Sequence, residues 1–163
     1  AVKESGLLVL LNKHIFNKKG YYPFGEKFNA RIAPKSFKEL ITLCVRKIKK
    51  KDMPCIVGVG DTVTSNKCTK TGIWLRGGSD RGFLTLIQEL GKAYKRNNKV
   101  ILVDSSWGEV DRPSCADGRL IGITDSKDPL KFNLIIKNGP EEYISFFKDL
   151  SKRRSQSKRS DNH

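Results

Sequence analysis

The segment GVGD (58–61) ends the apolar run CIVGVGD and carries the residue types best suited to chemistry. A dinucleotide-binding fingerprint would need glycine where Val63 stands, and a P-loop would need Gly-Lys-Ser/Thr, which is absent. The remaining chemical interpretation is that Asp61 is presented to a divalent cation, with Gly58 and Gly60 letting the backbone turn tightly and approach a phosphate. Mg²⁺ suits such a site because it binds one or two carboxylates together with waters and phosphate. The alternative is that Asp61 only caps the next turn.

Three further charged residues occupy positions that fit either a chemical or a structural role. Asp80 follows GGS and opens a predicted helix, where an acid is favoured by the helix dipole, so capping is its default role. Lys3 is either a solvated cation in a first helical turn or a cation that faces phosphate. Asp104 ends a predicted strand, but the chain contains no Asp-x-Asp pair, so we interpret Asp104 as structural.

Alternating helices and short buried strands must position these residues. The apolar spacing predicts helices over 3–14, 36–50, 79–96 and 141–150, and strands over 55–61, 100–104 and 132–137. Ser36 is the expected N-cap of the second helix, residues 62–79 are expected to form a hairpin with its turn near 70–72, and 105–130 is loop-like. This order predicts a layered α/β fold with a parallel sheet and right-handed crossovers. The third helix should turn five residues inward: Phe83, Leu86, Ile87, Leu90 and Tyr94.

The composition describes a basic globular protein. Lys+Arg 32 against Asp+Glu 17 gives a net charge of +15, and 37% of the residues are apolar, which is enough for a core. The lysines are scattered without a zinc-finger, RNA-binding or helix-turn-helix pattern, so specific nucleic-acid binding is not expected. The apolar runs are too short to cross a bilayer, so we expect a cytoplasmic chain with no membrane partner. The cysteines, expected to be reduced structural thiols, are Cys44, Cys55, Cys68 and Cys115.

Six segments carry a resemblance to a known family: VKESGLLVLLN, GYYPFGEKFNARIAP, MPCIVGVGDTVTS, GGSDRGFLTLIQELG, VDSSWGEV and DPLKFN. In this order they resemble the carboxyl-terminal part of the cyanobacterial glucosylglycerol-phosphate phosphatases, the salt-tolerance phosphatases, over nearly residues 2–154. That family is similar to the haloacid-dehalogenase-type phosphatases. The resemblance implies the C-terminal part of a haloacid-dehalogenase-like, Rossmann-type layered fold, incomplete in this chain. Residues 1–150 would belong to the phosphatase core and 151–163 would be a basic, disordered tail.

The resemblance also implies roles for single residues. In such phosphatases an aspartate nucleophile attacks phosphorus, a second aspartate serves as acid and base, and Mg²⁺ neutralises the phosphoryl oxygens. Lys3 matches the lysine that steadies the nucleophile, Asp61 matches the metal-binding acid at a strand end, and Asp80 resembles that motif's second acid. The usual second acid lies four residues after the first, where this chain has Ser65. Either an insertion over 62–79 folds back to bring Asp80 to the metal, or Ser65 lines the site instead.

The substrate implied by the resemblance is glucosylglycerol 3-phosphate, hydrolysed to the osmolyte glucosylglycerol and phosphate. The nucleophile segment and the Ser/Thr phosphate-binding motif normally precede all of these segments and are absent from the 163 residues. Because covalent catalysis needs its nucleophile, we expect the chain to be inactive by itself. The alternative class is a non-catalytic protein, either a truncated remnant or a basic module that binds anions or nucleic acid.

Overall fold

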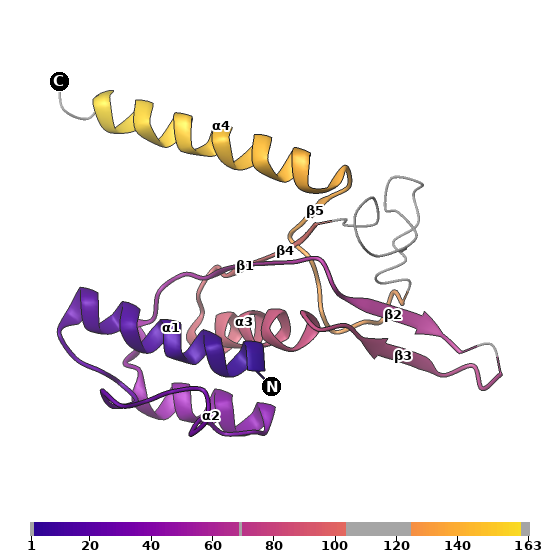
Figure 1. The fold of residues 1–163 in the computed structure, drawn as a ribbon, viewed down its shortest axis with the longest axis horizontal. Helices are drawn as coiled ribbons and strands as arrows, with labels where there is room; N and C mark the ends of the chain where they lie inside the picture. The colour runs from indigo at the N-terminus through magenta and orange to yellow at the C-terminus, as the bar shows by residue number, and fades with distance from the viewer. Residues whose placement is uncertain (1, 69, 104–124, 161–163) are drawn as a thin grey trace.

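Ten secondary-structure elements make up the part of the chain that the computed structural model describes, which is residues 2–68, 70–103 and 125–160 (Figure 1). In chain order they are α1 (Val2–Lys19), α2 (Phe37–Lys47), the short 3-10 helix η1 (Lys50–Asp52), β1 (Val57–Gly60), β2 (Thr64–Lys67), β3 (Trp74–Gly77), α3 (Arg81–Tyr94), β4 (Lys99–Val103), β5 (Leu134–Ile136) and α4 (Gly139–Ser160). The expected strand end at Asp104, the loop over 105–124 and Cys115 lie outside the described residues.

Three parallel strands form the main sheet, in the order β1-β4-β5. Val57 of β1 lies opposite Lys99 of β4, and Ile101 of β4 lies opposite Leu134 of β5. Parallel neighbours need a crossover connection, and α3 lies in the connection from β1 to β4. The predicted α/β class with a parallel sheet is therefore confirmed, and Asp61 directly follows β1 at the sheet's carboxyl edge.

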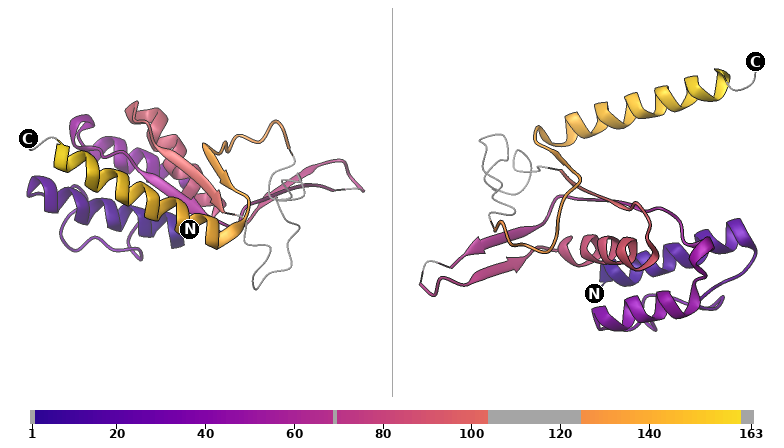
Figure 2. Two further views of the ribbon diagram at one scale, coloured as in Figure 1. Left: turned by 90° about the horizontal axis from the view of Figure 1, so that it is seen from above. Right: turned by 180° about the vertical axis from the view of Figure 1, so that it is seen from behind.

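Helices cover the two faces of this sheet unequally. Helices α1, α2 and α3 lie on one face, and α4 lies on the other (Figures 1 and 2). Leu8 of α1, Leu40 of α2 and Leu90 of α3 are almost fully buried in one shared core. Helix α3 packs directly on β1 because Gly58 has no side chain, since a Cβ atom there would lie 2.5 Å from Cδ1 of Ile87. The three-helix layer thereby carries the starts of α1 and α3 to the carboxyl edge of β1.

Local sequence signals locate the start of α2 well and the start of α3 less well. The Ser36 hydroxyl accepts the backbone N–H of Glu39 at 3.2 Å and donates to the Glu39 carboxylate at 2.7 Å, so the predicted N-cap is confirmed. Helix α3 begins at Arg81 rather than near Ser79. Four of its five predicted inward residues are buried, Phe83 is half-buried, and Leu84 is buried as well.

The predicted hairpin over 62–79 is confirmed. Strands β2 and β3 pair antiparallel, with Thr64 opposite Gly77. The backbone N–H of Cys68 donates to the Ile73 carbonyl at 2.8 Å, and Gly72 has a positive φ of 70° in the turn between the strands. The hairpin leaves the sheet after Asp61 and returns to the start of α3, so it brings the two ends of the 62–79 segment together.

Residues 151–160 of the tail expected over 151–163 belong to α4 in the structure, and residues 161–163 lie outside the described residues. The described side chains from Ser151 to Arg154 are exposed, and the good helix propensity of lysine and arginine favours this extension of the helix. Helix α4 contacts β4 and β5, and its Tyr143 and Phe147 pack on the cluster of Ile101, Val103 and Ile136. Within the described residues, no helix combines the length and apolarity that crossing a membrane requires.

The contact between α2 and α3 depends on one buried hydroxyl. Tyr94 donates to the Cys44 carbonyl at 2.6 Å and lies 3.1 Å from the Ile48 carbonyl at the end of α2. Tyr94→Phe should lower the free energy of unfolding by about 1–2 kcal/mol in urea denaturation, because the Cys44 and Ile48 carbonyls both lose the buried hydroxyl, although Cys44 keeps the Ile48 N–H as a donor.

Tyr22→Phe is the matched control, because its ring stacks on Phe16 and keeps that contact. The control should change the free energy of unfolding by less than about 0.5 kcal/mol. Equal effects of the two substitutions would contradict the role of the Tyr94 hydroxyl.

Candidate functional site

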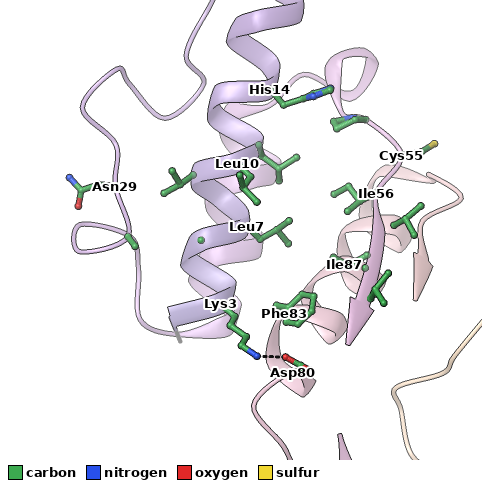
Figure 3. A pocket seen from close by; sticks show the side chains of 18 residues that line it. Lys3, Leu7, Leu10, His14, Asn29, Cys55, Ile56, Asp80, Phe83 and Ile87 are labelled. Carbon is green, nitrogen blue, oxygen red and sulfur yellow. Dashed lines mark hydrogen bonds and ion pairs between the residues drawn. The ribbon is translucent and has the colours of Figure 1, made fainter. Parts of the chain in front are cut away.

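Four segments of the chain meet at the carboxyl end of β1. Lys3 comes from the first turn of α1, Asp61 follows β1, the hairpin base holds Thr62 and Ser79, and Asp80 precedes α3. Figure 3 shows the Lys3 ammonium directed at the Asp80 carboxylate across the gap between α1 and α3. The structure thus brings together the three predicted site residues, although 77 positions separate Lys3 from Asp80.

Asp80 is the buried centre of this arrangement, with only 4% of its surface exposed. Its Oδ2 accepts the backbone N–H of Asp61 at 2.9 Å and that of Thr62 at 3.0 Å. Its Oδ1 accepts the Lys3 ammonium, and its own backbone N–H donates to the Thr62 carbonyl at 3.0 Å. Asp80 makes no side-chain cap bond to α3, so the default capping role is not observed. The carboxylate instead fixes the loop that follows β1.

The charge of Asp80 is stabilised despite its burial. Burial raises the pKa of this carboxyl, but hydrogen bonds from Lys3, Thr62 and Asp61 oppose burial and hold the pKa below its usual value. Asp80 is therefore ionised at neutral pH and forms an ion pair with Lys3. The Lys3 side chain is 51% exposed, and its ammonium also donates to the Ser79 hydroxyl at 3.3 Å. The Lys3 side chain is thus oriented by Ser79 and Asp80, the two residues before α3, while about half of its surface stays exposed to solvent.

Gly60 makes room for Asp80, and Gly78 makes room for the backbone of Thr62. A Cβ atom at Gly60 would lie 2.8 Å from Cβ of Asp80 and 3.0 Å from its Oδ2. Gly78 has a φ of 99°, and a Cβ atom there would lie 2.2 Å from the Thr62 carbonyl oxygen. The sequence predicted that Gly58 and Gly60 allow a tight turn. Both lie within β1, and the structure shows that they permit close packing of α3 instead.

The side chain of Asp61 has a different environment from that of Asp80. Asp61 is exposed, and its Oδ1 accepts the Thr62 hydroxyl at 2.7 Å. Its backbone N–H is held by Asp80, so the buried acid fixes the position of the exposed one. A carboxylate held in this way at a strand end can ligate a cation with little reorganisation.

Ser65, the alternative second site residue, is placed in another cluster. It lies fully buried in β2 opposite Arg76 of β3. The pKa of Asp128 is lowered in spite of its burial by hydrogen bonds from Arg81, the Leu130 backbone and the Ser65 hydroxyl. The hydroxyl of Ser65 therefore serves the interior of the hairpin base, and the insertion does fold back to bring Asp80 beside Asp61.

A network of two arginines and two aspartates fixes the hairpin base, and the sequence analysis missed it. Arg81 donates to both carboxylate oxygens of Asp128, at 3.0 and 2.6 Å, and to the Thr64 and Gly77 carbonyls of the two hairpin strands. Arg76 donates to Asp125 at 2.6 Å. The spacing of Asp125 and Asp128 was a visible signal, but their arginine partners lie 47 to 49 positions away. The aspartates and their arginine partners come together only when the hairpin has folded.

The donor set fits Mg²⁺ through Asp61 more readily than through Asp80. Mg²⁺ prefers oxygen ligands and commonly takes one or two carboxylates with waters and substrate phosphate. Asp61 offers an exposed carboxylate, whereas both oxygens of Asp80 already accept N–H or ammonium donors. No cluster of three or more His, Cys, Asp or Glu side chains suited to a metal occurs within residues 2–68, 70–103 and 125–160. Among these residues, Asp61 is thus the one candidate ligand, and Asp80 and Thr62 support it.

Replacing Gly60 tests the close approach of Asp80 to the strand. Gly60→Ala should lower the free energy of unfolding by about 1–3 kcal/mol, because the added methyl group pushes Asp80 and Leu84 away. Gly6→Ala on α1 is the matched control, since nothing lies within 4 Å of its Cβ position. The control should stabilise the chain by up to about 1 kcal/mol through helix propensity, measured by urea denaturation. Destabilisation by both changes would contradict this account.

Acid should destabilise the chain partly through Asp80. Its pKa lies below the ordinary value of 3.8, so its contribution to stability is complete above that value. The contribution is lost as the pH falls through 3.8 towards the lowered pKa. The free energy of unfolding should therefore fall less for Asp80→Asn than for the wild type between pH 7 and about pH 3.5. An equal fall in both proteins would show that Asp80 carries no such linkage.

The comparisons with known proteins identify the family of the chain. The family model described as glucosylglycerol-phosphate phosphatase matches residues 1–151. A protein of Synechocystis sp. named glucosylglycerol-phosphate phosphatase is 43% identical over 94% of this chain, and the match spans 39% of that protein's length. No solved structure matches the chain. On the family match and this identity, the chain belongs to the glucosylglycerol-phosphate phosphatase family.

Proposed function

We propose that the chain forms part of a phosphatase that hydrolyses the phosphate ester of glucosylglycerol to glucosylglycerol and inorganic phosphate. Membership of the family and the name of the Synechocystis relative support the reaction. The observation that carries the proposal is the joining of Lys3, Asp61 and Asp80 at the carboxyl end of β1. Ligand sites of open α/β sheets lie at the carboxyl ends of the strands, so both the position and the residue types of this arrangement suit a phosphatase site.

Each of the three residues has a role that follows from its surroundings. Lys3 presents a half-exposed ammonium that offsets the negative charge of a phosphoryl group. Asp61 presents an exposed carboxylate as a ligand for Mg²⁺, which when bound would neutralise phosphoryl oxygens. Asp80 is a positioning residue, because it holds the Lys3 ammonium and the backbone of Asp61. The Lys3 ammonium and a bound Mg²⁺ would thereby face one anionic substrate.

The rest of the site belongs in our proposal to another part of the protein. Phosphoryl transfer from an ester needs a nucleophile and a group that protonates the leaving oxygen. Asp61 and Asp80 are already assigned to the metal and to positioning. The match covers only 39% of the Synechocystis relative, so members of the family carry further polypeptide. We therefore expect that residues 1–163 alone do not release phosphate from glucosylglycerol 3-phosphate.

A fusion protein tests the proposal directly. It joins residues 1–163 to the part of the Synechocystis relative that lies outside their match, in the relative's own order. The fusion protein should release phosphate from glucosylglycerol 3-phosphate when Mg²⁺ is present, and this release should stop when EDTA is added. Asp61→Asn should lower its turnover at least about a hundredfold and raise the Mg²⁺ concentration needed, because the exposed ligand is lost.

Asp80→Asn should lower turnover to a similar degree with a smaller change in the Mg²⁺ requirement, because it disturbs Lys3 and the loop. Asp149→Asn is the matched control, since this exposed acid lies on α4 away from the site, and it should leave turnover unchanged. Near-normal turnover of the Asp61→Asn protein, or full activity in EDTA, would overturn the proposal.

A further inference from the structure

A small polar pocket lies at the edge of the sheet opposite the candidate site, where β4 and β5 begin. Its volume is about 260 Å³. The second half of α3, the loop from α3 to β4 and the residues just before β5 form its walls. Asp80 precedes α3 whereas Arg96 follows it, and a helix of 14 residues is about 21 Å long. The pocket is therefore separate from the candidate site.

Among the described residues that line this pocket, three are cationic and none is acidic. The three cations are Lys92 on α3, Arg96 in the loop after it and Lys131 before β5. Three like charges around one small volume repel one another, and a bound anion would relieve that repulsion. The charge of the lining therefore favours an anionic ligand.

The three cations keep hydrogen-bond donors for such a ligand. The Nε atom of Arg96 is buried and has no hydrogen-bond partner among the described residues. A buried N–H without an acceptor is unfavourable, and an anion bound to this guanidinium can supply the acceptor. The Lys92 ammonium donates to Glu89 at 2.6 Å, and the Lys131 ammonium donates to the Ser126 carbonyl at 3.0 Å. Because an ammonium has three N–H donors, each lysine can bind a further acceptor.

Hydrogen bonds to backbone groups hold parts of the pocket wall in place. The Gln88 side chain accepts the Lys131 backbone N–H at 2.8 Å and donates to the Pro129 carbonyl at 2.8 Å, so it fixes the segment before β5 on α3. Nη2 of Arg96 donates to the Lys50 carbonyl at 2.9 Å, which orients the guanidinium. The Lys131 backbone and the Arg96 guanidinium are thus placed before a ligand binds, which lowers the entropy cost of binding.

We propose that this pocket binds a small oxyanion of the phosphate class through the Arg96 guanidinium and the ammonium groups of Lys92 and Lys131. Arginine and lysine are common phosphate-binding side chains in proteins. One water molecule takes up about 30 Å³ of the liquid, so about 260 Å³ has room for about eight non-hydrogen atoms. Inorganic phosphate or a short phosphate ester fits this size. The site is additional to the candidate site and holds whichever reaction the protein performs.

Proton–nitrogen NMR of residues 1–163 tests the pocket through the Arg96 Nε–H resonance, which lies far from Asp80. Inorganic phosphate should shift this resonance saturably, with a Kd of about 1 mM or lower. Methyl phosphate, a minimal phosphate ester, separates the two sources of the ligand. Tighter binding of methyl phosphate would assign the pocket to a phosphorylated metabolite, and equal or tighter binding of inorganic phosphate would assign it to the free ion. Both results support the proposal.

Lys131→Gln should weaken phosphate binding at least about fivefold, because the pocket loses one ammonium group. The fold should persist, since the Lys131 side chain is exposed and Gln88 is bound by its backbone. Lys38→Gln is the matched control, because it removes the same charge from an exposed position on α2 outside the pocket, and it should leave the affinity unchanged.

Three results would overturn the proposal. The first is an Arg96 Nε–H resonance that phosphate does not shift. The second is equal phosphate affinity of the wild type and the Lys131→Gln variant. The third is the same shift with chloride at equal ionic strength, because general screening of charge would then explain the response.

Discussion

The burial of the Asp80 carboxylate is the constraint on which the rest of the site depends. A buried charge is costly unless donors surround it, and Asp80 receives the Lys3 ammonium and the N–H groups of Asp61 and Thr62. Each donor comes from a segment that must then stay in place. The first turn of α1, the end of β1 and the start of α3 are thus joined by one side chain, and Gly60 provides the space.

The burial of Asp80 also gives the two acids, Asp61 and Asp80, different roles. The Asp61 backbone N–H donates to Asp80, and the two acids differ in exposure, so in our proposal the exposed acid meets a cation and the buried acid positions it. The arginine–aspartate network around Arg81 supports this division, because it fixes the hairpin between the two acids. The net charge of +15 includes Lys3, which the site holds beside Asp80.

Much of the fold could be predicted from local signals, and the partners of the site residues could not. The run CIVGVGD predicted β1 and the position of Asp61, because a short apolar run with glycine and an acid is typical of a buried strand end. The role of Asp80 depended on α3 approaching Gly60, a tertiary contact that helix spacing does not encode. Apolar periodicity, the signal used for the other helices, did not find residues 151–160, where charged residues with good helix propensity continue α4. Ser65 was a site candidate because the family's second acid usually lies four residues after the first, whereas in the structure Ser65 is buried in β2 opposite Arg76.

The most direct test of the central claim is a carbon-13 NMR titration of the Asp80 carboxyl in residues 1–163 and in the Lys3→Met variant. The account predicts that Asp80 titrates below the ordinary aspartate value of 3.8 in the wild type, because Lys3 and two backbone N–H groups stabilise its charge. The pKa should rise in Lys3→Met, where one donor is lost while burial remains. An Asp80 pKa at or above 3.8 that does not change in the variant would contradict the claim that this carboxylate organises the site.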